Sequence, residues 1–324
     1  MERKNIKNDE KSLQDFTKIF YETNKKLIFC DTLDDSKNYF DIMVDGLFSL
    51  FRSTNPRFSK SDYEANAKYM LQMFFTKCLS IKHLLEGVNY DYKNSKEVYS
   101  FRSLMDFPSL LSLTRDLYEA LCVFELIYIY PKKEEHHIIM YNLYVIQGLS
   151  ERQKYYSEEY KEAKDLELDL IEKARQQIKN TCFYLQHKEC QKQLDYIMNE
   201  CPTCWRSIDE NRTPIIKKFN QENDYTLFGI KEGVFKDLYS YLSVYAHPTY
   251  LSVLQYKDAF RIEDNRSQML ACNAIRNAIV IMSFYISDYC GLFPDCEEVL
   301  NEFNIEKKLL IGFYDDVFRN KHNI

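Results

Sequence analysis

Three side chains that can form hydrogen bonds share one face of an otherwise apolar segment, residues 238–248. Ser240, Ser243 and His247 recur at spacings of three and four residues, which place them on one stripe of an α-helix. Pro248 disfavours the helical conformation of the residue before it, so His247 should be the last residue of this helix or the first beyond it. A polar stripe on an apolar helix needs polar partners elsewhere in the fold. The segment therefore outlines a binding or catalytic site.

An arginine–glutamate pair lies in the most apolar helix that the sequence predicts, residues 108–130. Burying a charge without a partner costs several kcal/mol, so Arg115 and Glu119 should pair with each other or with a third group. Either the ion pair fixes the helix register or the two residues bind a ligand or act in catalysis. If the pair meets the polar stripe, the pocket consists of Arg115, Glu119, Tyr241, Ser243 and His247. Arg115 would then hold an anionic group, and His247 would donate or accept a hydrogen bond.

A second constellation has partial metal-ligand spacing. His187 and Cys190 are followed by the pair Cys201 and Cys204, with Pro202 inside that pair. Such a Cys-x-x-Cys pair suits a tetrahedral zinc site if two upstream residues complete the ligands. The upstream half, however, falls in a helical pattern rather than in a turn. We therefore expect ordinary reduced cysteines, no metal and no cofactor.

Two short motifs carry a family resemblance. Residues 115–120 read Arg-Asp-Leu-Tyr-Glu-Ala, and residues 241–248 read Tyr-Leu-Ser-Val-Tyr-Ala-His-Pro. In order and spacing, the motifs resemble the bacterial family catalogued as domain of unknown function 5677, over roughly residues 60–290. The resemblance implies an all-α fold and no established activity. In general character the chain also resembles the HEPN superfamily of helical bundles, many of which are ribonucleases in defence and toxin systems.

The HEPN resemblance can be tested within the sequence. The resemblance would require an arginine four to six residues before a histidine on one helix, where the pair acts on the ribose hydroxyl and the phosphate. None of the six histidines has an arginine at that spacing; they are residues 83, 136, 137, 187, 247 and 322. RNA cleavage would therefore require that Arg115 and His247 meet across two helices.

Composition favours a helical protein. The 324 residues include only 7 glycines and 7 prolines, too few for the turns of a large sheet.

The net charge of −6 and the lack of a basic block argue against a non-specific DNA coat or a binder of anionic membranes. The longest apolar runs, residues 118–130 and 278–286, are too short to span a bilayer. Without an export signal, the ten cysteines indicate reduced thiols in the cytoplasm.

Caps and periodicity predict about ten helices. They cover residues 9–30, 36–53, 61–87, 106–131, 133–147, 151–179, 188–200, 230–247 and 264–290, and a last one starts at Pro294. Residues 88–100 should form a polar loop, Thr213-Pro214 should start a short helix, and residues 248–262 should be an extended connection. Gly148 should end the helix before it. The charged helix 151–179 should form a hairpin with residues 188–200.

The predicted architecture is an all-α, multi-helix bundle with a long charged helical arm. Residues 1–149 form N-terminal helices of the bundle, residues 150–204 form the arm, and residues 205–324 complete the same bundle. The favoured function is recognition of an anionic small molecule or RNA in the polar pocket, in a bacterial defence setting. Two alternatives stay open. One is a metal-independent HEPN-like endoribonuclease, and the other is a non-catalytic protein that binds a partner or a second copy through the 151–200 arm.

Overall fold

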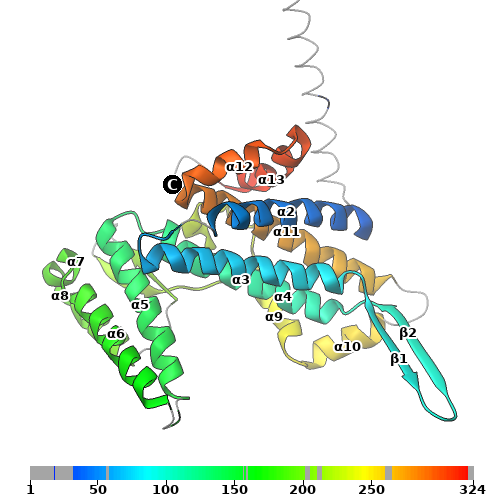
Figure 1. Cartoon of the computed structure of the whole chain (residues 1–324), viewed down its shortest axis with the longest axis horizontal. Helices are drawn as coiled ribbons and strands as arrows, with labels where there is room; N and C mark the ends of the chain where they lie inside the picture. Colours follow the sequence, from blue (N-terminus) through cyan, green and yellow to red (C-terminus); the bar gives the residue numbers. More distant parts are fainter. Residues whose placement is uncertain are drawn as a thin grey trace, which may run out of the picture. The chain divides into compact units, whose positions relative to one another are not determined.

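The computed structural model describes residues 18, 32–55, 58–155, 157, 160–200, 205–209, 214–259 and 265–319 (Figure 1). Two compact units divide the chain. Unit 1 combines the residues up to Leu121 with those from Lys231 onward, and unit 2 comprises Cys122–Ile230. The division is not the three-segment one drawn from the sequence. In particular, the proposed boundary at 149/150 falls inside a helix, α5.

Unit 1 contains helices and one β-hairpin. Its elements are α2 (Leu33–Thr54), α3 (Asp62–Leu84), β1 (Val88–Lys93), β2 (Val98–Leu104), α4 (Phe107–Phe124, whose last turn is assigned to unit 2), α9 (Leu238–Ala246), α10 (Tyr250–Ala259), α11 (Arg266–Leu292), the 3-10 turn η4 (Pro294–Cys296), α12 (Glu297–Asn301) and α13 (Ile305–Phe318). Helix α11 is the centre of the core and packs against α2, α10 and α13. By length and composition α11 could cross a membrane, but 67% of its most apolar stretch is buried, as in the core helix of a globular unit.

Unit 2 continues the chain with a π-helical segment, η1 (Glu125–Ile129). Its other elements are α5 (Glu134–Gln153), α6 (Lys161–Lys179), α7 (Cys182–Gln186), α8 (Lys188–Glu200), β3 (Arg206–Asp209), β4 (Ile215–Lys218) and the 3-10 turn η3 (Asp224–Phe228). Helix α6 packs along α5, and its inward face buries Ile171, Ala174 and Ile178. The only strands among the described residues are the two hairpins, so the predicted all-α class is confirmed.

The helix ends predicted at Ser61, Gly87 and Asp106 are confirmed. The Ser61 side chain accepts a hydrogen bond from the backbone N–H of Glu64 at 3.2 Å, which starts α3. Gly87 follows α3 with φ +83°, and a Cβ there would lie 2.6 Å from the Ser103 backbone, so only glycine fits. The Asp106 side chain accepts from Ser109 N at 3.2 Å where α4 starts. The predicted helix 9–30 lies outside the described residues, apart from Lys18.

Two predictions failed because short strands were missed. Residues 88–100, predicted as a polar loop, lie mostly in the antiparallel pair β1–β2, because aromatic side chains alternate with polar ones at the two-residue period of a strand. The short helix expected from Thr213-Pro214 is wrong as well, because Ile215–Lys218 pair with Arg206–Asp209 as β4.

The other errors concern helix ends. Gly148 does not end α5, which continues to Gln153, and the predicted helix 151–179 is interrupted before α6 begins at Lys161. The hairpin partner of α6 is α5 and not residues 188–200. Helix 230–247 begins only at Leu238, because Gly233 and Asp237 have positive φ angles of 90° and 59°. The extended connection 248–262 instead contains α10, whose first turn is capped by Thr249.

Candidate functional site

Arg115 is held between two helices by three polar contacts. Its Nε donates to Glu119 Oε1 at 3.0 Å, and Nη2 lies 2.9 Å from the same oxygen. Nη2 also donates to the hydroxyl of Tyr239 on α9 at 2.9 Å, and the guanidinium carbon lies 4.9 Å from the centre of the Tyr239 ring. The cluster therefore joins α4 to α9, and the predicted Arg115–Glu119 pair forms.

The cluster is partly open to solvent. The Arg115 side chain is 21% exposed and that of Glu119 is 30% exposed. Nη1 makes no hydrogen bond with any described residue. It is also not one of the buried polar atoms that lack a hydrogen-bond partner. An arginine amino group that has no hydrogen bond within the protein can donate to a carboxylate or phosphate oxygen from outside.

The electrostatics of the cluster favour a permanently charged arginine. Burial lowers the pKa of Arg115, but the hydrogen bond from Arg115 to Tyr239 and the negative charge of Glu119 outweigh burial, so the net shift is upward. Burial raises the pKa of Tyr239, and the hydrogen bond from Arg115 offsets part of that rise. At neutral pH the cluster therefore contains a charged guanidinium and a neutral phenol.

Helices α4 and α9 run antiparallel where they meet. Ser112, three residues before Arg115, donates its hydroxyl to the backbone carbonyl of Tyr245, six residues after Tyr239. Positions later in α9 therefore face earlier positions of α4. Because His247 follows Tyr245, it lies beyond the Ser112 end of the contact and away from Arg115.

Among the described residues, Tyr241, Ser243 and His247 make no hydrogen bond or ion pair with the side chains of Arg115 or Glu119. Ser243 donates its hydroxyl to the Tyr239 carbonyl one turn earlier in α9, at 2.6 Å. Tyr241 packs edge-to-face on Tyr245, with ring centres 5.9 Å apart, and hydrogen-bonds to Asn273. Both side chains therefore serve α9 and its packing on α11.

His247 ends α9 as its proline neighbour predicts. It has extended dihedrals, φ −133° and ψ 151°, and is exposed. Its carbonyl accepts from Thr249 N at 2.8 Å and from the Ser252 hydroxyl at 3.2 Å, which builds the turn into α10. Among the described residues no hydrogen bond or ion pair joins the His247 imidazole to Arg115. The arrangement that RNA cleavage would require is thus not formed by direct contact.

Tyr239 is the site residue that the sequence analysis missed. It lies four residues before Ser243 and so belongs to the same helical stripe. Only the packing of α9 on α4 shows which part of that stripe meets Arg115. A second ion pair lies next along α4, where Lys77 of α3 contacts Asp116 at 2.6 Å.

The upstream half of the proposed zinc site is engaged elsewhere. Cys190 is buried, and its thiol donates to the Pro214 carbonyl at 3.0 Å. His187 packs its ring on Phe183 with centres 5.1 Å apart. No group of three or more metal-binding side chains occurs in the part of the chain that the structure describes. Cys201 and Cys204 lie outside that part, so the expectation that they bind no metal stays a prediction.

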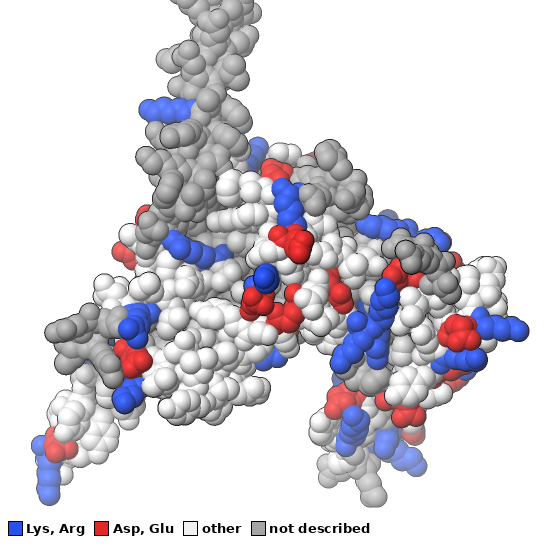
Figure 2. Space-filling model, turned by 180° about the vertical axis from the view of Figure 1, so that it is seen from behind, with Lys and Arg blue, Asp and Glu red and all other residues white. Residues whose placement is uncertain are grey.

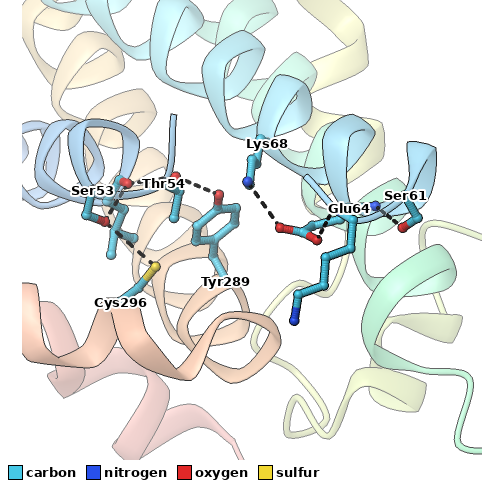
Figure 3. A network of polar contacts seen from close by, with 9 residues as sticks. Ser53, Thr54, Ser61, Glu64, Lys68, Tyr289 and Cys296 are labelled. Atoms are coloured by element: carbon cyan, nitrogen blue, oxygen red, sulfur yellow. Dashed lines mark hydrogen bonds and ion pairs between the residues drawn. The ribbon is translucent and has the colours of Figure 1, made fainter. Parts of the chain in front are cut away.

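Elsewhere in unit 1, a buried hydrogen bond joins α2 to α11. In Figure 3, the Tyr289 hydroxyl of α11 donates to the Thr54 hydroxyl at 3.0 Å, where α2 ends. Beside it, Lys68 lies 3.1 Å from the Glu64 carboxylate within α3. An open depression of about 580 Å³ between Gly233 and Val317 contains none of the predicted site residues.

Comparisons with family models, with curated proteins and with solved structures found no match to this chain.

Proposed function

We propose that this chain is a helical recognition protein that binds an anionic group of a small molecule or of RNA at Arg115. The observation that supports the proposal is the fixed orientation of the Arg115 guanidinium. Glu119 and Tyr239 bind Nε and Nη2 of the guanidinium, while Nη1 makes no hydrogen bond with the described residues and the side chain is 21% exposed. A fork that is already oriented loses little conformational freedom when a carboxylate or phosphate binds.

The wider setting belongs to the same proposal. Membership of the bacterial family catalogued as domain of unknown function 5677 rests on the motifs around Arg115 and His247. We propose a cytoplasmic location from the free cysteines of the described residues, and a role in defence from the HEPN-like character of the sequence. The ribonuclease alternative is less well supported, because His247 and Arg115 share no contact among the described residues.

A binding assay tests the proposal. Fluorescently labelled single-stranded RNA and, separately, inorganic phosphate are titrated with wild type, Arg115→Ala, and Arg52→Ala as a control that loses the same charge from an exposed position on α2. We expect Arg115→Ala to abolish binding of the probe that wild type binds, and Arg52→Ala to leave it unchanged. Equal loss in both variants would show that only net charge matters and would refute specific binding at Arg115.

The same RNA distinguishes recognition from cleavage. A neutral hydrogen bond is worth about 1 kcal/mol net, so His247→Ala should weaken binding by no more than about fivefold. If the protein is instead a ribonuclease, the wild type cleaves the RNA and His247→Ala lowers the rate by roughly a hundredfold or more. Each variant is first checked for an unchanged melting curve.

A further inference from the structure

The β1–β2 hairpin has two chemically different faces. Residues directly opposite each other in the register share a face, and the pairs Tyr90–Phe101 and Tyr92–Tyr99 are two residues apart along each strand. One face therefore consists of four aromatic side chains, each between 41% and 56% exposed. We call it the aromatic face. On the other face, the Asp91 carboxylate accepts a hydrogen bond from Ser100 at 2.6 Å and contacts Arg102.

None of the described residues of unit 1 buries the aromatic face. Every residue of β1 is exposed, as is every residue of β2 except Leu104. A two-stranded hairpin is marginally stable in water unless its apolar face packs on something else. Exposed aromatic area of this kind marks an interaction site. Figure 1 shows the hairpin extending away from the helices of unit 1.

Helix α10 of the same unit presents a second uncovered apolar surface. Tyr250, Leu251, Val253 and Leu254 are all exposed, Tyr250 by 85%, while Ser252 and Ala259 on the other side of the helix are buried. We call the four exposed side chains the α10 face. Seen from behind, the surface beside the hairpin, where Figure 1 places α9 and α10, is almost free of charged side chains (Figure 2).

Neither surface selects a charged partner. The aromatic face contains no ionisable carboxylate or amine, and the charges of α10 itself are one of each sign, Lys257 and Asp258. This argues against nucleic acid or a strongly charged protein as the occupant. An apolar surface of equal size and similar chemistry is required, and the chain itself supplies one.

The areas and lengths of the two surfaces match. With large aromatic side chains covering roughly 150–250 Å² each, the half-exposed aromatic face offers about 400 Å², and the α10 face offers about the same. Neither alone reaches the roughly 800 Å² per partner of a stable interface, but the two together do. A strand of seven residues is about 24 Å long and a ten-residue helix about 15 Å, so the hairpin can cover α10 along its whole length.

We infer that the chain forms a two-fold symmetric dimer in which the aromatic face of each copy packs on the α10 face of the other. Symmetry makes the two contacts identical, so both uncovered surfaces of both chains are buried at once. The hairpin is stabilised by its partner's helix rather than by its own unit. This interface differs from the 151–200 arm to which the sequence analysis assigned partner binding.

Sedimentation of the full chain tests the dimer directly. Wild type is measured from nanomolar to high micromolar concentration and should reach twice the chain mass of 38.9 kDa. The hairpin variant Tyr92→Ser/Tyr99→Ser and the helix variant Val253→Ser/Leu254→Ser should each raise the dimer dissociation constant by more than about a hundredfold. The matched control Lys93→Ser/Val98→Ser changes a register pair on the opposite face and should leave the constant unchanged.

Mixing the two defective variants tests the exchange itself. In a mixed dimer, the intact hairpin of the helix variant meets the intact α10 of the hairpin variant, so one of the two contacts is restored. The mixture should therefore dimerise more tightly than either variant alone. A wild type that stays monomeric overturns the inference, and so does a dimer that the helix variant does not weaken. Circular dichroism confirms that all variants keep their helical content, because all the altered side chains are exposed.

Discussion

Arg115 and Arg319 of unit 1 both contact carboxylates, and the two arginines differ mainly in burial. Arg319, which ends α13, is 4% exposed and donates through Nη1 and Nη2 to both oxygens of Asp288, with the Nη2 bond at 2.9 Å. Asp315 lies 3.3 Å from Nη1. Arg115 makes a comparable contact with Glu119, but the two side chains are 21% and 30% exposed. The same pair of chemical groups thus forms a buried cluster at Arg319 and a partly exposed cluster at Arg115.

The difference in burial separates structural from functional roles. Burying an ion pair costs much desolvation, so such a pair persists only where the opposite charges lie in contact and solvent is excluded. The Arg319 guanidinium also lies over the Phe284 ring at 4.6 Å, so α11 covers it. The Arg115 cluster costs less to desolvate and retains a donor for an incoming anion. An arginine that binds a ligand must be fixed but not enclosed.

The largest expected effect comes from opening the closed cluster. Arg319→Ala leaves Asp288 and Asp315 buried without their cation and should lower the free energy of unfolding by about 3–5 kcal/mol. Urea denaturation of the full chain measures it. As a control, the same experiment on Arg52→Ala should show almost no change. A loss below about 1 kcal/mol would mean that the cluster is hydrated and that burial does not distinguish the two arginines.

The second largest effect is a loss of stability at alkaline pH, which should be larger for a core tyrosine than for Tyr239, the tyrosine that is hydrogen-bonded to Arg115. Burial raises the pKa of Tyr289 well above its usual value and raises the pKa of Tyr245 to about 12. The folded state therefore keeps these protons between about pH 10 and pH 12 while the unfolded state loses them. Stability is fully present below pH 10 and should fall as the pH rises, by about 1.4 kcal/mol per pH unit for each tyrosine.

Substituting single tyrosines shows which of them causes the loss of stability at alkaline pH. Tyr289→Phe should remove its share of the pH slope between pH 10 and 11, measured by urea denaturation at each pH. Tyr239→Phe should change the slope less, because Arg115 offsets part of the effect of burial on the pKa of Tyr239. If the two variants have equal slopes, Arg115 does not influence its tyrosine.

Part of this picture could be predicted from sequence, because it depends on local chemistry. Ser61 and Gly87 bound α3 through contacts that span only a few residues. Arg115 and Glu119 pair because one helical turn brings them together. The hairpin was missed because its alternating tyrosines and charged residues have the composition of a loop. The partner Tyr239 was missed because the face of α9 that meets α4 is decided by packing, which spacing along one helix does not show.

The third effect is a small one on stability. The Arg115–Glu119 pair is partly exposed, so Arg115→Ala should lower the free energy of unfolding by about 1 kcal/mol or less. That loss should shrink in molar salt, because ions screen an exposed pair. The loss from Arg319→Ala should persist in the same salt. A large, salt-independent loss in Arg115→Ala would place both arginines in the same structural class.

The smallest effect tests whether Tyr239 positions the arginine. Tyr239→Phe keeps the ring beneath the guanidinium and removes only the hydroxyl that accepts from Nη2. A neutral hydrogen bond contributes about 1 kcal/mol, so the affinity for the anionic probe that wild type binds should fall by no more than about fivefold. The melting temperature should stay nearly constant, because the Tyr239 side chain is only partly buried.

Tyr241→Phe on the same helix is the matched control and should leave the affinity unchanged, since Tyr241 hydrogen-bonds to Asn273 instead. Equal affinity losses in both variants would mean that the helix, rather than its contact with Arg115, sets the site. An affinity gain in Tyr239→Phe would show that the tyrosine competes with the ligand for the guanidinium.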